Sequence, residues 1–127
     1  MLLQIIHYAR LNDAGDFEAI ALLYTPDAVF SRPTEPEVHI RGRPAILATL
    51  RARAPRTTRH VMTNIEVMVD SSTRARARST VLLFVGDAQP SPTPIKGTLV
   101  GSFDDILEAH GNEWLFAQRL GALQMKS

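Results

Sequence analysis

The spacing of apolar residues changes along the chain, from a helical period in the first part to a period of about two later on. Near the start, Leu2, Ile6, Ala9 and Asp13 recur at intervals that place them on one face of a helix. This pattern predicts a first helix over residues 2–13. It also places a carboxylate, that of Asp13, in line with apolar side chains.

Glycine and proline divide the following residues into short elements. Gly15 is predicted to end the first helix, because glycine adopts the left-handed conformation at little cost. Asp16 can then cap a second helix, with Phe17 and Ile20 on its inner side, that ends at Pro26.

Two short strands and a third helix are predicted next. Ala28–Ser31 and Val38–Ile40 are expected to pair as a small hairpin across the turn at 34–37. Pro44 suits the first turn of a helix that ends before Pro55, with Ile46, Leu47 and Leu50 as its apolar residues.

After Pro55 apolar and polar residues alternate, which is typical of strands. Alternation is clearest in the second long strand, where Arg74, Arg76 and Arg78 share one face and small or apolar residues the other. Four long strands are predicted, at Arg59–Val69, Arg74–Val85, Lys96–Leu107 and Trp114–Ala122. The order indicates an α+β fold, with N-terminal helices packed on one face of a curved antiparallel sheet.

Composition narrows the classes of protein but does not select a function. A chain of 127 residues with 45% apolar residues is expected to form one domain, residues 1–127. The formal net charge of +1 gives no reason to expect a nucleic-acid or membrane partner. The chain has no cysteine, no signal-peptide pattern and no apolar run of membrane-spanning length, so we expect a cytoplasmic protein.

Candidate chemistry begins at the first helix. A carboxylate at Asp13 would be partly desolvated, which suits a general acid or base, although Asp13 could instead help to cap the corner before Gly15. Tyr8 lies on another side of the helix, where its hydroxyl could polarise a substrate oxygen or simply take part in packing.

Among the four histidines, His60 stands out because it opens the first long strand, whereas His39 and His110 lie in turn-like contexts. Strict alternation places His60 opposite Val61 and Ile65, so either that face lines a pocket or a bulge between Met62 and Asn64 switches the register. No metal-binding spacing of histidines is present, and no metal or organic cofactor is expected.

Arginines form a local basic run at Arg51, Arg53, Arg56 and Arg59, which is interpreted as a solvated face or an anion-attracting rim. Arg119 is predicted on the Leu115–Ala117–Gly121 face of the last strand, opposite Trp114 and Phe116. If that face is inward, Arg119 is a buried cation that needs an anion.

Several stretches together resemble the SnoaL-like group of the nuclear-transport-factor-2-like (NTF2-like) superfamily. The resemblance rests on Asn12-Asp13-Ala14-Gly15-Asp16-Phe17, Tyr24-Thr25-Pro26-Asp27-Ala28-Val29-Phe30, Ile40-Arg41-Gly42-Arg43-Pro44 and Arg59-His60-Val61-Met62-Thr63-Asn64. It implies a cystatin-like cone, in which a strongly bent sheet wraps around helices and leaves a pocket at its open end. It also implies a homodimer formed through the outer face of the sheet.

The resemblance also implies an active site. Scytalone dehydratase and the bile-acid dehydratases use a tyrosine, an aspartate and a histidine at positions that Tyr8, Asp13 and His60 match, and Arg119 could correspond to a pocket arginine of the latter. The expected substrate-binding residues are Arg119, Phe30, Met62, Phe103, Trp114 and Phe116.

The chain also departs from these relatives. A further polar catalytic residue on the next strand is replaced here by Leu82, Leu83 and Phe84, and the catalytic aspartate of ketosteroid isomerase falls at Arg32. The hypothesis is a dehydratase or isomerase acting on a small apolar cyclic hydroxy or carbonyl compound, of polyketide, steroid or aromatic type. The alternative is a non-catalytic module of the same fold that binds a small ligand or serves as a dimeric partner.

Overall fold

The computed structural model describes all 127 residues as three helices and one six-stranded sheet. The helices are α1 (Leu2–Ala14), α2 (Phe17–Ala21) and α3 (Arg43–Arg51), and the strands are β1 (Tyr24–Arg32), β2 (Glu35–Arg41), β3 (Thr57–Val69), β4 (Arg74–Gly86), β5 (Gly97–His110) and β6 (Glu113–Lys126). Sheet order is β2-β1-β6-β5-β4-β3, and only the β1–β6 pair is parallel. The α+β class and the four long antiparallel strands are confirmed.

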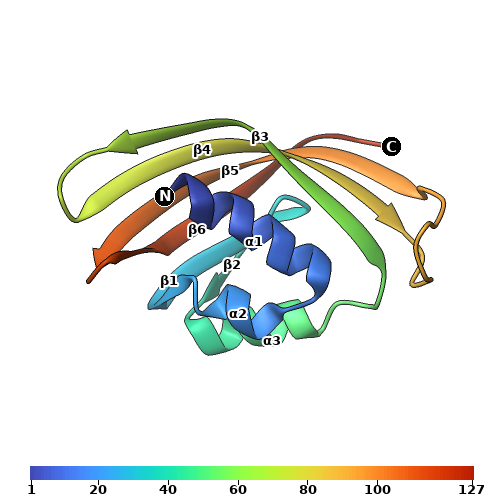
Figure 1. The fold of residues 1–127 in the computed structure, drawn as a ribbon, viewed down its shortest axis with the longest axis horizontal. Coiled ribbons are helices and arrows are strands. Elements are labelled where there is room, and N and C mark those ends of the chain that lie inside the picture. The colour runs from blue at the N-terminus through green and yellow to red at the C-terminus, as the bar shows by residue number, and fades with distance from the viewer.

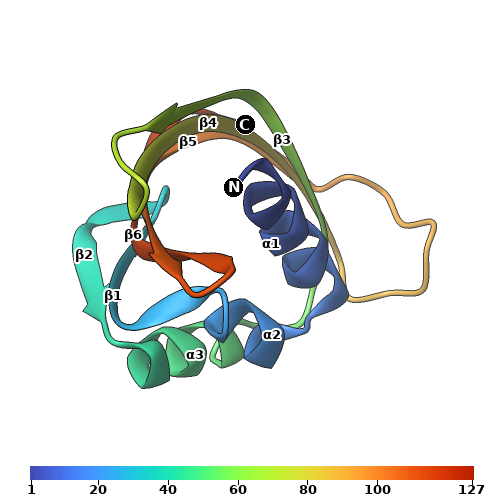
Figure 2. The same cartoon turned by 60° about the vertical axis from the view of Figure 1, so that its left-hand side comes forward.

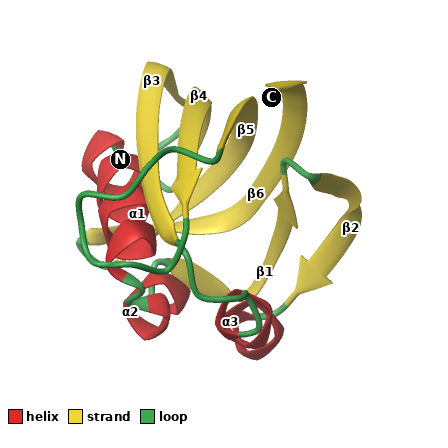
Figure 3. Ribbon diagram, turned by 90° about the vertical axis from the view of Figure 1, so that its right-hand side faces the viewer, coloured by secondary structure: helices red, strands yellow, loops and turns green.

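The long strands bend over α1, so that the helix lies inside the curve of the sheet (Figure 1, Figure 2). Helices α2 and α3 lie together at one end, below β1 (Figure 3). The core fills the space between the helices and the concave face of the sheet. Its largest fully buried apolar side chains are Tyr24, Phe116, Ile5, Ile20, Ile46, Leu50 and Leu107.

Helix α1 presents a different face to the core than the sequence pattern predicted. Ile5, Tyr8 and Ala9 are its buried residues, whereas Leu2 is 49% exposed. The predicted stripe is therefore wrong in part, because the helix is turned so that Tyr8 rather than Leu2 points inward. Gly15 ends the helix in the left-handed conformation, with φ of 72°, as predicted.

The second helix is shorter than predicted. Helix α2 ends at Ala21, and β1 already begins at Tyr24. Pairing with β6 explains the change, because the Phe116 N–H donates to the Leu23 carbonyl and Tyr24 pairs with Phe116. Tertiary hydrogen bonding thus extends the strand into a segment that local pattern assigned to helix.

The hairpin after β1 is also tighter than predicted. Strand β2 begins at Glu35, so the turn falls at Pro33 and Thr34 rather than over residues 34–37. Pro36 lies within β2, which is an edge strand of the sheet and so tolerates a residue without an N–H donor.

A bulge in β3 decides which side chains face inward. The β3–β4 register shifts between Thr63 and Glu66, and Asn64 has a positive φ of 49°. Before the shift His60 and Met62 point to the concave side, and after it Ile65 packs against the core. The expected switch of register therefore exists, one to two residues later than predicted.

A second bulge, in β6, corrects the predicted position of Arg119. The β5–β6 register shifts where Ile106 pairs with Gln118 and Leu107 with Phe116, so Ala117 is the extra residue. Phe116 and Arg119 consequently both point inward, and the prediction that they occupy opposite faces is wrong. Alternation alone cannot place a residue that follows a bulge.

The β1–β2 turn packs closely against β6 at Gly121. A Cβ added at Gly121 would lie 2.7 Å from the carbonyl carbon of Arg32 and nearer still to the backbone nitrogen of Pro33. The Gly121 N–H also donates to Ser31 Oγ at 3.1 Å. This contact joins the hairpin to the long strands and so forms one wall of the interior.

We expect Gly121→Ala to destabilise the protein by about 1–3 kcal/mol, because the added methyl group meets backbone atoms that cannot rotate away. Urea unfolding followed by circular dichroism measures the loss. Gly97→Ala is the matched control, since a Cβ at Gly97 meets nothing within 4 Å. Equal stability of the two variants would contradict this account of the contact.

Candidate functional site

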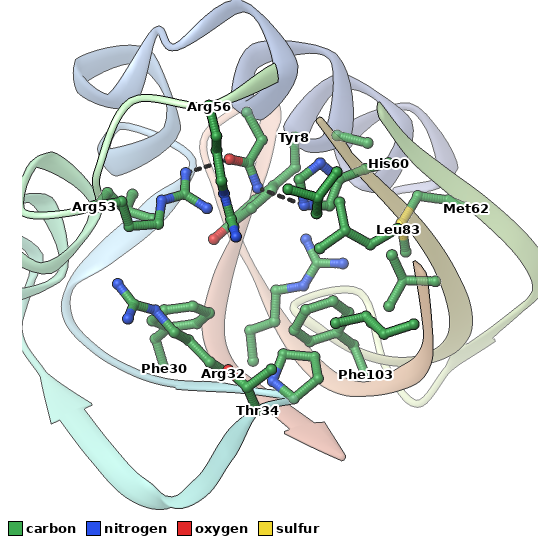
Figure 4. Close-up of a pocket in the computed structure, with 18 of the residues that line it drawn as sticks. Tyr8, Phe30, Arg32, Thr34, Arg53, Arg56, His60, Met62, Leu83 and Phe103 are labelled. Atoms are coloured by element: carbon green, nitrogen blue, oxygen red, sulfur yellow. Dashed lines mark hydrogen bonds between the residues drawn. The ribbon is translucent and has the colours of Figure 1, made fainter. Parts of the chain in front are cut away.

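A cavity of about 290 Å³ lies between α1, the concave face of the sheet and the β1–β2 turn. Figure 4 shows Arg32, Arg53 and Arg56 along one side of it, and Met62, Leu83 and Phe103 along the other. Tyr8 and His60 also line the cavity. The space is therefore apolar on one side and cationic on the other, and several polar atoms converge on it.

Asp13 and His60 form a close pair, here termed the dyad, at the junction of α1 and β3. Asp13 Oδ1 lies 2.6 Å from His60 Nδ1, and the two side chains are 9% and 11% exposed. The same carboxylate accepts the His60 backbone N–H and the Thr58 hydroxyl, each at 3.0 Å. An acceptor-only carboxylate beside Nδ1 requires that Nδ1 carry the proton, which leaves Nε2 available to accept one.

Asn12 supports the same assignment of the imidazole. Its Nδ2 lies 3.3 Å from His60 Nε2, and its Oδ1 accepts a hydrogen bond from Arg53. Because Arg53 can only donate, the amide oxygen of Asn12 must face Arg53 and the amide nitrogen must face Nε2. Nε2 is thus an unprotonated acceptor whose one hydrogen bond within the protein is long, so a substrate proton can readily replace it.

Tyr8 and Tyr24 form a buried hydroxyl pair. Their oxygens lie 2.8 Å apart, and their rings meet edge to face at a centroid distance of 5.8 Å. Burial raises the pKa of both hydroxyls, that of Tyr24 well above its usual value. Both therefore stay protonated. If Tyr24 donates to Tyr8, the Tyr8 hydroxyl is free to donate into the cavity that it lines.

Arg119 is a buried cation, being only 1% exposed. Its guanidinium lies 4.3 Å from the ring centroid of Tyr8, 4.1 Å from that of Phe103 and 5.0 Å from that of Phe116. The anion that it needs is Asp105, whose Oδ1 lies 3.3 Å from Arg119 Nε. Neither Nε nor Nη1 makes a directed hydrogen bond within the protein.

Asp105 is almost fully buried, and its ionisation is correspondingly unfavourable. Burial raises its pKa to about 6, although the positive charge of Arg119 acts in the opposite direction. The pair is therefore an ion contact above that pH and a single buried cation below it. Asp105 lies between Phe103 and Leu107 on the inward face of β5, directly across from Arg119 in the register.

Most of the predicted site residues line the cavity, one supports a residue that lines it, and two lie elsewhere. Tyr8 and His60 line the cavity, and Asp13 stands behind the imidazole without lining it. Four of the expected substrate-binding residues also line the cavity: Phe30, Met62, Phe103 and Arg119.

Trp114 and Phe116 do not line the cavity, so their predicted role in binding has no support from their positions. Phe116 is fully buried beneath the Tyr8 ring, because the bulge at Ala117 turns it into the core. Trp114 packs against the core at the start of β6, next to Ala109 of β5.

Sequence reasoning missed Asn12 and Asp105. Asn12 lies four residues after Tyr8, a helical spacing that places both on one face of α1 and could have identified it. The alternation of Phe103, Asp105 and Leu107 could likewise have indicated an inward carboxylate. Arg53 and Arg56 belong to the basic run interpreted from the sequence as a solvated face or an anion-attracting rim. Both line the cavity, whereas Arg51 and Arg59 do not.

The sequence was compared with known protein families. Residues 4–120 match the family described as SnoaL-like domain. The chain belongs to this family. No functionally curated protein matches it. The match spans nearly the whole sequence, and it agrees with the resemblance inferred from the residues of the first helix, the hairpin and the first long strand.

Solved structures extend the comparison for this SnoaL-like protein. A candidate scytalone dehydratase from Novosphingobium aromaticivorans is 27% identical with a TM-score of 0.84, over 98% of this chain and 81% of that one. A protein of unknown function from Mycobacterium tuberculosis is 28% identical with a TM-score of 0.73, over 97% and 74%. An NTF2-like protein with a cystatin-like fold, also from N. aromaticivorans, is 21% identical with a TM-score of 0.72, over 94% and 77%.

The SnoaL-like domain contains no helix long and apolar enough to cross a membrane. No three His, Asp or Glu side chains gather closely enough to hold a metal ion. The polar side chains that line the cavity are those of Tyr8, Thr34, Asn12 and His60, together with four arginines.

The raised pKa of Asp105 predicts the direction of a pH effect on stability. The folded state holds this proton up to about pH 6 and the unfolded state only to about 3.8. Tighter binding of this proton therefore stabilises the folded state at acid pH, and the stabilisation is lost as the pH rises through 6. Its full size is of the order of 3 kcal/mol.

Urea unfolding from pH 4.5 to 7.5, for the wild type and Asp105→Asn, measures this contribution as the difference between the two profiles. We expect the wild type to lose stability relative to the variant as the pH rises. If attraction to Arg119 outweighed burial, the pKa would be lowered and the difference would have the opposite sign.

Proposed function

We propose that this SnoaL-like protein is a cofactor-independent dehydratase or isomerase for a small apolar cyclic hydroxy or carbonyl compound. The observation that carries the proposal is the Asp13–His60 pair, which leaves a basic Nε2 at the wall of a largely apolar cavity. An imidazole whose Nε2 is free to accept a proton is suited to remove a proton next to a carbonyl group.

The first step is removal of the proton α to the substrate carbonyl by His60 Nε2. Asp13 holds the Nδ1–H and stabilises the imidazolium that forms, without itself taking the proton. The electron pair of the broken C–H bond moves toward the carbonyl and gives an enolate. Return of the proton to another carbon completes an isomerisation.

In a dehydration, the enolate electron pair instead expels the hydroxyl group from the β-carbon. That group needs a proton to leave as water. Leu83 occupies the wall of the cavity on β4, where a second polar catalytic group would be expected from the family resemblance. The imidazolium of His60 is therefore the donor, so one residue takes the α-proton and returns it to the leaving hydroxyl on the same face of the ring.

The Tyr8 hydroxyl is placed to stabilise the enolate oxygen. It lines the cavity, stays protonated because burial raises its pKa, and can receive a hydrogen bond from Tyr24 while it donates its own. A donor fixed in this way costs little reorganisation when negative charge develops. Arg119, over the Tyr8 ring, adds positive potential at the same place.

The comparisons support this proposal at the level of the class of reaction. The solved structure named as a candidate scytalone dehydratase is 27% identical to this chain over nearly its whole length. A cyclic β-hydroxy ketone is accordingly the first substrate to test. 3-Hydroxy-1-tetralone is a simple example, because loss of water converts it into 1-naphthol, whose absorbance can be followed.

We expect His60→Gln to reduce turnover about 10²–10⁴-fold, because the proton acceptor is lost while the shape of the side chain is roughly kept. Asp13→Asn should also reduce kcat, since an amide can donate to Nδ1 and so favour the wrong tautomer. Measurements are naphthol formation and exchange of the α-proton in deuterium oxide, a step that dehydration and isomerisation share.

His39→Gln, an exposed histidine on β2, is the matched control and should keep wild-type rates. If both dyad variants exchange the α-proton as fast as the wild type, the acid–base proposal is wrong. If they also keep the ligand affinity of the wild type, the alternative of a ligand-binding module is favoured instead.

A further inference from the structure

The walls of the cavity carry a strong excess of positive charge. Four arginines line it, Arg32, Arg53, Arg56 and Arg119, and no aspartate or glutamate does. The whole chain has a formal net charge of only +1, so this concentration is local and is not a consequence of overall composition. A cavity of one charge sign concentrates ligands of the opposite sign.

The four arginines differ in how many hydrogen bonds and ion pairs they make within the protein. Arg119 is the buried arginine at the inner end of the cavity, its floor, and is paired with Asp105. Arg32 donates to the Thr49 carbonyl at 2.9 Å and lies 3.6 Å from Glu35.

Arg53 and Arg56 complete the rim of the cavity. Arg53 donates to Asn12 and has its guanidinium carbon 4.9 Å from the centroid of the Phe17 ring. Arg56 makes no hydrogen bond and no ion pair within the protein, and it is exposed at the mouth of the cavity.

Arg32 ends β1, whereas Arg53 and Arg56 belong to the connection between α3 and β3, yet the three side chains meet at one place. Figure 4 shows their side chains on the same side of the cavity, across from Met62 and Leu83. Burial is the main cause that lowers the pKa of Arg53, to about 10, and repulsion from Arg56 and Arg32 adds to it. The pKa of Arg56 is lowered by burial and by Arg32. Bringing these charges together opposes folding unless an anion is bound between them.

We propose that the ligand of this cavity carries an anionic group, a carboxylate or a phosphate, that binds between Arg32, Arg53 and Arg56. Its apolar ring then lies against Met62, Leu83 and Phe103, on the opposite wall. Guanidinium groups suit this task because their planar N–H donors match the oxygens of carboxylate and phosphate. The identity of the substrate class rests on the proposed function, but binding of the anion does not.

Asn12 connects the anion site to the reacting centre. It contacts Arg53 through its amide oxygen and His60 Nε2 through its amide nitrogen. An anion held by Arg53 and Arg56 would thus be one amide group away from the catalytic base. Charge recognition at the mouth would fix which carbon of the ring faces Nε2, and so would serve to position the substrate.

The test compares ligands that share a naphthalene ring and differ in the charge of its substituent. 2-Naphthoate and 2-naphthyl phosphate are anionic, and 2-naphthamide is the neutral control. Their dissociation constants are measured by calorimetry with the wild type, Arg56→Gln and Arg41→Gln. Arg41 is an exposed arginine of β2 that lines no part of the cavity, and Arg56 makes no hydrogen bond or ion pair that the substitution would break.

We expect at least one of the two anions to bind the wild type about 10-fold or more tightly than naphthamide, with the preference falling as salt is added. The tighter of the two anions distinguishes carboxylate from phosphate. Arg56→Gln should remove most of the preference and change the affinity for naphthamide less than about 2-fold, whereas Arg41→Gln should change neither.

Two results would overturn the proposal: equal affinity of the wild type for all three ligands, or the same loss of anion affinity in Arg41→Gln as in Arg56→Gln. The His60→Gln variant separates this inference from the proposed function. It should keep the preference for the anion while losing turnover. Loss of the preference in His60→Gln would mean that the anion pairs with an imidazolium and not with the arginines.

Discussion

The Asp13 carboxylate holds the first helix against the free edge of the sheet, and the rest of the site depends on that contact. Strand β3 is the last strand in the sheet order, so its outer N–H groups have no neighbouring strand to accept them. Asp13 accepts one of them, that of His60, together with the Thr58 hydroxyl and His60 Nδ1. One side chain thus covers a strand edge, joins α1 to β3 and fixes the tautomer of the imidazole. A change at Asp13 therefore affects both the dyad and the packing of the helix.

Two bulges allow the concave face of one strand to line the cavity over part of its length and to pack in the apolar core over the rest. In β3, His60 and Met62 face the cavity, and the shift around Asn64 then turns Ile65 inward where the core is apolar. In β6, the extra residue Ala117 lets Phe116 fill the core while Arg119 lies at the floor of the cavity. In a strand without a bulge, every second residue faces inward along the whole length, so core residues and cavity residues would have to keep one strict alternation. The bulges remove that constraint at the boundary between core and site.

The sequence predicted the elements well where the signal was local. Gly15, Pro44 and the alternation after Arg74 each mark a boundary or a face through backbone preference alone. It failed where pairing between distant segments decided the outcome, as at Tyr24, which joins β6 rather than continuing α2. The site followed the same division. Tyr8, Asp13 and His60 could be placed by resemblance, whereas the inward turn of Phe116 and the partnership of Arg119 with Asp105 depend on a bulge and a register that no local pattern encodes.

Positive charge lies next to apolar surface at both ends of the cavity, but its surroundings differ between the floor and the mouth. At the floor, water is excluded, so Arg119 is accompanied by a carboxylate and three aromatic rings, and the charge of the pair is nearly balanced when Asp105 is ionised. At the mouth, Arg56 is exposed and has no partner within the protein, so its charge is left available to a ligand. A ligand entering from solvent therefore meets uncompensated charge before it meets balanced charge. Its anionic end is attracted to the mouth, and its apolar end occupies the interior, where the imidazole of His60 lies.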